Sequence, residues 1–213
     1  MRRISLLESH ETLTKMNVSV ALKLTIARFI NSSLVLVFIN SESRKWYKGG
    51  DLVYDATILI CIISLTAPTM ELISIPRIVK WLKISKEKAK GEDCLLTQRE
   101  ANTLCEGTMI DSANNISNFM NMIMTCVFYS PIIPQAIPIG LASSAYCYWV
   151  TKYSLLRRYK MPDMFSELMA TFFANFMPWM VLAWSLSAFS FMTAQAREDL
   201  KISVKSAKSF NFG

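Results

Sequence analysis

A stripe of polar residues runs along one apolar segment, and its residue types suit the passage of ions or lipid headgroups. Asp111, Asn114, Asn118, Asn121 and Thr125 follow one another at intervals of three, four, three and four residues. On a helix this spacing places them on one face, about 80° wide. Polar side chains are costly against lipid, so this face should point toward protein or water. It either lines a polar pathway, with Asp111 attracting cations at its mouth, or forms hydrogen bonds that hold helices together.

Polar residues in other apolar segments are further candidates for lining such a pathway. Glu167 and Asn175 lie on one face of the segment that follows residue 163, and Glu71 lies near the end of the segment that begins at residue 51. An acidic residue within a membrane span is a functional candidate by default. Glu71 has a second interpretation, which is an ion pair with Arg77 or Lys80.

The residues needed for catalysis or metal binding are missing from the sequence. It contains no P-loop, GxSxG, HExxH or dinucleotide-binding fingerprint. His10 is the single histidine, and the five cysteines include no CxxC pair. The sequence therefore predicts neither a zinc site nor a disulfide framework. We expect no enzymatic activity, no metal and no cofactor.

Apolar blocks separated by charged segments indicate an all-α integral membrane protein. Of the 213 residues, 52% are hydrophobic and 18% are charged. A bilayer core about 30 Å thick takes about 20 helical residues to cross. The blocks predict a single bundle of about five transmembrane helices, at residues 16–40, 51–75, 108–130, 137–157 and 163–195. The other parts are predicted as a cytosolic N-terminal tail (1–15), a basic cytosolic linker (77–107) and a polar, mobile C-terminal tail (196–213).

Prolines and small residues predict where these helices bend, end and approach one another. Pro68 predicts a kink in the 51–75 helix, and Pro76 predicts its end. The segment YSPIIPQAIPIG predicts a tight hairpin, which serves either as a plain turn or as a hinge for gating. The hinge interpretation names Tyr129, Ser130, Pro131, Pro134, Pro138, Gly140 and, in the last helix, Pro178. Gly140 and Ser144 also form a small-xxx-small pair, which predicts close helix contact.

The basic linker is expected to contain two short helical segments. Thr97 and Glu100 match a capping box, so a helix should begin near residue 98. An amphipathic segment at the membrane surface is expected to follow Pro76, from the helical spacing of Arg77, Lys80, Trp81 and Lys83.

The distribution of basic residues predicts the orientation of the chain. With the N-terminus in the cytosol, the segments on that side contain fourteen of the 23 lysines and arginines, and the segments on the other side contain seven. Lys23 and Arg28, within the first helix, are the remaining two. The excess of positive charge inside favours this orientation. The net charge of +7 is then explained by lipid headgroups, and nucleic acid is not an expected partner.

The run NFMNMIMTCVFYSPIIPQAIPIGLASSAYCYWVTKYSLLRR resembles the seventh and eighth helices of the OSCA-type stress-gated cation channels. In that family a helix ends in a Tyr-Ser-x-x-x-Pro pattern, which is followed by Pro-x-Gly, a second short helix and a basic or aromatic exit. The matching residues are Tyr129, Ser130, Pro134, Pro138, Gly140, Lys152, Tyr153 and Arg157. The segments ARFINSSLVLVFIN and GGDLVYD look like the preceding pair of helices, so the resemblance covers residues 20–195.

The resemblance implies an all-helical fold, dimeric assembly, a conduction path and mechanical or lipid-linked gating. The anoctamins and the transmembrane channel-like proteins are related branches, whose members move ions, scramble phospholipids or do both. The leading hypothesis is therefore a tension-gated cation channel with a groove lined by the 108–130 helix. Its partners would be the bilayer, inorganic cations, and a second copy or other membrane subunits. The alternatives are an accessory subunit of a larger membrane complex and a lipid scramblase.

Overall fold

The fold, given by a computed structural model, is described for residues 13–40, 52–73, 75–89, 97–107, 111–160 and 168–210. The elements in these ranges are helical, as the sequence predicted. In chain order they are α2 (Leu13–Phe29), η1 (Ile30–Leu34), α3 (Val35–Asn40), α4 (Leu52–Ile73), α5 (Ile75–Ala89), α6 (Gln98–Cys105), α7 (Ser112–Tyr129), α8 (Ala136–Arg157) and α9 (Leu168–Phe210).

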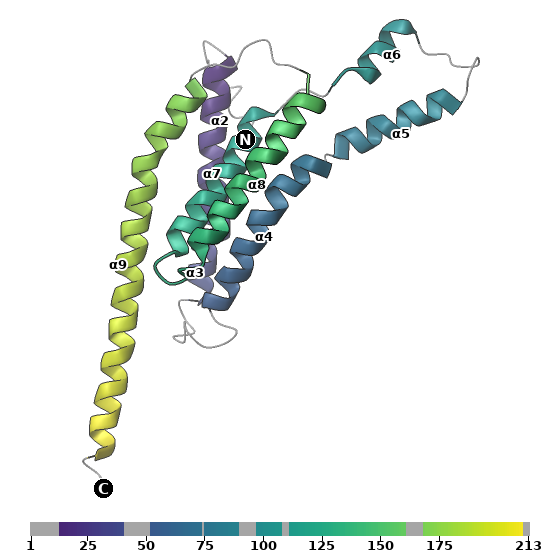
Figure 1. The fold of residues 1–213 in the computed structure, drawn as a ribbon. Coiled ribbons are helices and arrows are strands. Elements are labelled where there is room, and N and C mark those ends of the chain that lie inside the picture. The colour runs from purple at the N-terminus through teal and green to yellow at the C-terminus, as the bar shows by residue number, and fades with distance from the viewer. Residues whose placement is uncertain are drawn as a thin grey trace.

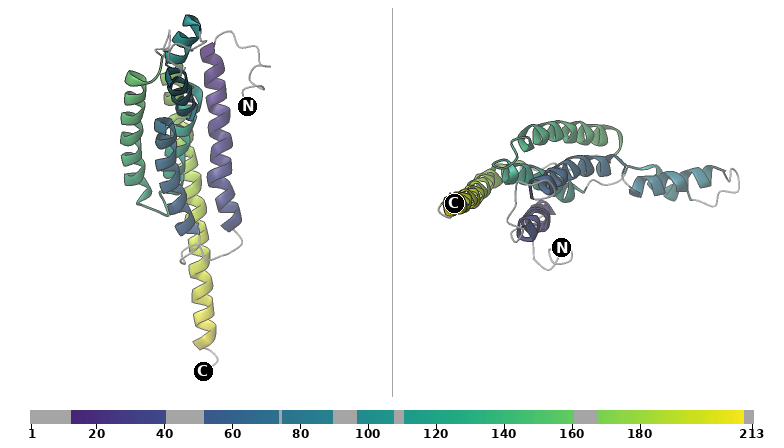
Figure 2. Two further views of the ribbon diagram at one scale, coloured as in Figure 1. Left: turned by 90° about the vertical axis from the view of Figure 1, so that its right-hand side faces the viewer. Right: turned by 90° about the horizontal axis from the view of Figure 1, so that it is seen from below.

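The long helices lie side by side, and the chain reverses direction from each one to the next (Figure 1, Figure 2). The helix α7 is at the centre of the bundle, because it contacts α2, α4, α8 and α9. The shorter helices α5 and α6 lie outside the bundle, at the end where α2 begins and α8 ends (Figure 1). At the opposite end α9 continues well past its neighbours (Figure 1).

Within the part of the chain that the structure describes, three helical stretches are long and apolar enough to cross a membrane. They are Lys15–Asn40, Leu52–Ala89 and Thr171–Arg197, and they indicate a membrane location. With 18 and 22 residues, α7 and α8 are also long enough to be considered as membrane spans. They are less apolar, because α7 carries several asparagines and α8 several serines and tyrosines. Of the five predicted spans, three are therefore supported by length and composition.

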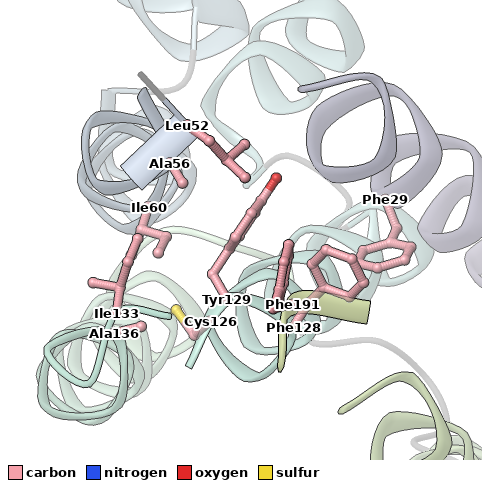
Figure 3. Close-up of a cluster of buried hydrophobic side chains, with 10 residues drawn as sticks. All are labelled: Phe29, Leu52, Ala56, Ile60, Cys126, Phe128, Tyr129, Ile133, Ala136 and Phe191. Carbon is pink, nitrogen blue, oxygen red and sulfur yellow. The ribbon is translucent and has the colours of Figure 1, made fainter. Parts of the chain in front are cut away.

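One part of the core is a group of buried side chains near the α7–α8 hairpin (Figure 3). Tyr129 is fully buried there. The ring of Phe128 meets Phe29 of α2 at 5.4 Å and Phe191 of α9 at 5.8 Å, both edge to face. Such aromatic pairs contribute about 0.5–1.5 kcal/mol each beyond their buried area. This cluster therefore fixes the first and last long helices against α7.

A second part of the core lies nearer the other end of α7. Phe172, Phe176 and Met180, at four-residue intervals on α9, pack against Val20 of α2 and Met120 of α7. A four-residue interval keeps the three side chains on one face of α9. The remaining faces of α9 expose large apolar side chains, among them Trp179, Val181, Leu182, Leu186 and Phe189. An outward apolar surface of this kind is typical of a helix in contact with lipid.

Several helix limits differ from the predictions. The helix α9 continues to Phe210, so most of the segment predicted as a polar tail after residue 195 is helical. The residues there are mostly good helix formers, and no proline or glycine follows Pro178 until Gly213. Pro68 and Pro178 both stay inside their helices. Pro76 lies in the first turn of α5, where its missing N–H is tolerated, so it begins a helix beyond α4.

The segment predicted as one helix at 16–40 contains a π-helical stretch, η1, between α2 and α3. The Val35 N–H donates to the Ile30 carbonyl across this wider turn. A π turn inserted in an α-helix shifts one backbone carbonyl out of the regular pattern and often lies at a functional position. The sequence predicted a regular helix through this stretch, although Asn31, Ser32 and Ser33 interrupt the apolar pattern there.

Candidate functional site: polar clusters and a groove around α7

Arg28 of α2 reaches across to the polar stripe of α7. Its guanidinium donates to Asn114 Oδ1 at 2.7 Å, to Ser117 Oγ at 3.0 Å and to the Asn114 carbonyl at 3.4 Å. The fork of N–H donors on an arginine suits several acceptors at once. These hydrogen bonds offset part of the cost of holding a half-buried cation away from water. Asn114 is therefore engaged in a contact between helices.

The other end of the stripe is also bonded to the first helix. Thr125 Oγ1 lies 3.0 Å from Ser33 Oγ in η1, and the Tyr129 hydroxyl donates to the Ser33 carbonyl at 2.8 Å. The π turn thus leaves the Ser33 carbonyl available for a hydrogen bond from α7. Asn121, between the two contacts, is buried, and its Oδ1 has no hydrogen-bond partner in the described part of the chain. The stripe lies mainly against α2 and η1, to which Asn114 and Thr125 form hydrogen bonds.

Two members of the stripe have other surroundings. Asp111 is exposed and caps α7, where its Oδ1 accepts the Asn114 N–H at 3.4 Å. A carboxylate at this position also interacts favourably with the helix dipole. Asn118 is half-buried. The five residues predicted to line one pathway therefore have different surroundings. Asp111 caps the helix, Asn118 is half-buried, and the other three lie on the face that contacts α2 and η1.

Glu71 connects α4 with α7 and α8. Asn115 Nδ2 donates to Glu71 Oε1 at 3.1 Å, and Thr151 Oγ1 donates to Oε2 at 3.3 Å. The ion pair predicted with Lys80 is not formed, because Lys80 Nζ donates to backbone carbonyls of the α6 region instead. The Arg77 side chain lies outside the described residues. Glu71 is thus a half-buried acidic group, inside a candidate span, whose two hydrogen-bond donors are neutral.

A groove opens beside this cluster, between α7, α8 and the beginning of α9, with a volume of about 530 Å³. This volume is in the range of ligand-binding pockets. The polar residues of its lining are Asn115, Ser144, Thr151 and Lys152, and the remainder is apolar or aromatic, including Ile116, Phe119, Leu155 and Phe173. At 100° per residue, Asn115 and Phe119 lie about 100° and 140° around α7 from Asn114, which contacts α2. The groove and the stripe are therefore separate features of one helix.

The candidates on the last helix do not join these clusters. Asn175 and Pro178 are exposed on α9, and Glu167 lies outside the described residues. The periodicity that places Phe172 and Phe176 in the core turns Asn175 outward. Asn175 therefore does not face the stripe, and its role in lining a pathway stays a prediction.

The predicted hairpin between α7 and α8 is present at residues 130–135. Ser130 Oγ accepts a hydrogen bond from Trp184 Nε1 of α9 at 3.1 Å, which attaches the turn to the last helix. Pro131 is half-buried, and Pro134 is exposed. Pro138 lies in the first turn of α8, where a proline is tolerated. These residues form an ordered turn, and their role as a gating hinge stays a prediction.

Gly140 of α8 packs closely against α7. A Cβ added there would lie 3.2 Å from both Cβ and Sγ of Cys126, which is tighter than ordinary van der Waals contact. The close contact predicted from the Gly140–Ser144 pair is therefore confirmed at Gly140. Ser144 Oγ donates to the Gly140 carbonyl of its own helix at 2.8 Å and lines the groove.

Charged side chains join α5 and α6 to the end of α8, on the side of the bundle that the sequence predicts to be cytosolic. Lys160 Nζ lies 2.6 Å from Glu106 Oε1, and Lys80 Nζ donates to the Glu106 carbonyl at 2.6 Å. The Lys160 hydrogen bond and charge lower the pKa of Glu106 below its ordinary value. Gly107 packs so closely against the chain that a Cβ there would lie 2.6 Å from the backbone nitrogen of Lys160. The end of α8 is thus joined to α6, and through Lys80 to α5.

The capping box predicted at the start of α6 is confirmed. The Thr97 hydroxyl accepts the Glu100 N–H, and Glu100 Oε2 accepts the Thr97 N–H at 3.0 Å. This reciprocal pairing satisfies two otherwise unpaired donors at the helix start. The hydrogen bonds from Thr97 lower the pKa of Glu100.

Within the described residues, no group of three histidine, cysteine or acidic side chains is placed to hold a metal. The chain matches no protein-family model, no curated protein and no solved structure. The resemblance to the OSCA-type channels and the cation-channel hypothesis therefore stay predictions.

Sequence reasoning missed two residues of the Glu71 cluster, Asn115 and Thr151. The adjacent pair Asn114–Asn115 contained a usable signal, because neighbours on a helix point about 100° apart. Two adjacent amides in an apolar segment indicate polar partners on two sides of that helix. Thr151 offered no comparable signal, since a hydroxyl in an apolar helix can bond to its own backbone.

Proposed function

We propose that this chain is a non-enzymatic membrane protein of five spans, which binds bilayer phospholipid in the groove between α7, α8 and α9 and moves it. The observation that carries the proposal is the groove itself, with a volume of about 530 Å³ and a mostly apolar lining. It favours the scramblase alternative over the leading hypothesis of a cation channel lined by the stripe.

The assignment of α7 and α8 as spans is supported by their length and surroundings. At 1.5 Å per residue they are about 27 and 33 Å long, close to the roughly 30 Å of a bilayer core. They lie alongside the three candidate spans (Figure 1). Several of their polar side chains form hydrogen bonds with neighbouring helices, among them Asn114, Asn115 and Thr151. This bonding explains how such helices can be less apolar and still cross a membrane.

The chemistry of the groove suits a phospholipid. Apolar walls such as Ile116 and Phe119 can accept an acyl chain without a desolvation cost. The Lys152 ammonium is exposed at the groove and can form a charge-assisted hydrogen bond with a lipid phosphate. The face of α7 that was the candidate for a cation pathway is engaged with Arg28 of α2 and Ser33 of η1.

A fluorescent-lipid assay on the purified protein in liposomes tests the proposal. We expect lipid transfer between leaflets that falls about fivefold in Lys152→Ala, as estimated from the roughly 1 kcal/mol that a basic residue contributes near anionic lipid. Arg157→Ala is the matched control, because Arg157 is exposed on the same helix and does not line the groove. Absence of lipid transfer by folded wild-type protein would overturn the proposal.

Cation passage is a second candidate function, and the observation that favours it is Glu71. A half-buried carboxylate held by two neutral donors can attract a cation within a membrane. Cation flux into liposomes under membrane tension tests this candidate, with loss of flux expected in Glu71→Gln and retention in Asp55→Asn. Dimeric assembly and tension gating, which the channel resemblance implies, belong to this candidate. Protein that moves neither lipid nor cations would favour the accessory-subunit alternative.

A further inference from the structure

The helix α5 has an apolar face that no other helix of the described residues covers. Ile78, Val79 and Leu82 lie on one side of the helix, and each is about half exposed. Trp81, at the border of this face, is 64% exposed. Monomeric soluble proteins seldom leave so many large apolar groups together in water. The face therefore needs an apolar environment.

Basic residues surround this apolar face. At 100° per residue, Lys83 and Lys88 flank it on its two sides, and Lys86 follows in the last turn. Lysine side chains in such positions can cover apolar surface with their stems while the ammonium groups reach phosphate. A helix of this composition is typical of one lying in the plane of a membrane interface.

The position of α5 in the fold agrees with such a surface. It follows α4 in the chain, and both lie within the candidate span Leu52–Ala89. It then diverges from the bundle (Figure 1, Figure 2). Lys80 donates to the carbonyls of Thr103 and Glu106 at 3.2 and 2.6 Å, which holds α5 to α6 at the level where α8 ends. Because a membrane-crossing α4 must leave the bilayer at this level, α5 begins at headgroup depth.

We propose that α5 is a binding site for anionic phospholipid headgroups, with its apolar face inserted at the boundary of the acyl chains and its lysines on the lipid phosphates. The expected ligand is lipid and not an acidic protein, because the helix starts at the membrane and presents a large apolar face beside its charges. The inference needs only the membrane location, and it is independent of lipid movement in the groove.

Hydrogen exchange of the full chain, reconstituted in vesicles of neutral lipid or of neutral lipid with phosphatidylserine, tests the site. We expect the amides of residues 78–89 to exchange several-fold more slowly in the anionic vesicles, and high salt to remove the difference. The triple variant Lys83→Gln, Lys86→Gln, Lys88→Gln should lose this protection. The matched control is Lys201→Gln, Lys205→Gln, Lys208→Gln, which neutralises three lysines at the far end of α9 and should keep it.

Equal exchange of α5 in neutral and anionic vesicles, with the remainder of the protein protected, would overturn the proposal. Loss of the protection in the α9 control would also overturn it, because the effect would then follow from net charge and not from α5. Since only purified protein and defined lipids are present, a protein partner cannot produce the expected result.

Discussion

At the scale of single residues, the charged side chain of Arg28 connects α2 with α7. Its half-buried guanidinium is bonded to Asn114 and Ser117. Replacement by methionine would remove the donor and leave these two groups without it, at a cost of about 1–3 kcal/mol. We expect Arg28→Met to lower the melting temperature in detergent by several degrees. Arg28→Lys keeps the charge but not the several N–H donors, so its melting temperature should lie between those of the wild type and Arg28→Met. An unchanged melting temperature in Arg28→Met would mean that the contact does not stabilise the fold.

Glu106 gives a prediction about pH at the end of the bundle. Its pKa is lowered by the hydrogen bond and charge of Lys160. A lowered pKa means that the contact stabilises the folded state at neutral pH, and that this contribution is lost as pH falls through the lowered pKa of Glu106. Titration of the carboxyl carbon by NMR should therefore give a pKa that rises toward the ordinary value in Lys160→Met. Lys152→Met should leave it unchanged, and an equal rise in both variants would contradict the assignment to Lys160.

At the scale of elements, the close contact at Gly140 tests the packing of α7 against α8. Gly140 approaches Cys126 so closely that a Cβ would lie 3.2 Å away. Valine at this position would force α7 and α8 apart, and overpacking of this kind costs about 1–3 kcal/mol. We expect Gly140→Val to unfold at a clearly lower temperature than Ala142→Val, whose side chain is exposed on the same helix. Similar melting temperatures would show that the two helices can separate freely.

The elements themselves were predictable where the cause is local. The Thr97–Glu100 capping box, the hairpin after Tyr129 and the small residue at Gly140 each act over a few residues, so the sequence was sufficient. The pairing of polar groups was not predictable, because it depends on which helices become neighbours. Arg28 meets Asn114 across 86 positions of sequence, and Glu71 meets Asn115 across 44. The sequence identified a polar stripe on α7, and the packing of α2 determined what the stripe bonds to.

At the scale of the whole molecule, the arrangement of helices depends on whether α7 and α8 cross the membrane. Composition supports three spans, and the side-by-side packing of α7 and α8 with those spans (Figure 1) favours five. Both numbers are odd, so the locations of the two chain ends cannot distinguish them. The location of the hairpin between α7 and α8 does distinguish them, because with five spans the hairpin lies on the side of the membrane opposite α6.

Labelling with a membrane-impermeant thiol reagent makes this distinction in sealed vesicles. Cys105, in the last turn of α6, is exposed and reports one side, and Gln135→Cys, at an exposed position of the hairpin, reports the other. In a background whose other cysteines are replaced by alanine, we expect the two positions to be labelled from opposite sides. Labelling from the same side would reduce the bundle to three spans. The groove between α7, α8 and α9 would then face water, and its apolar lining could no longer serve a bilayer lipid.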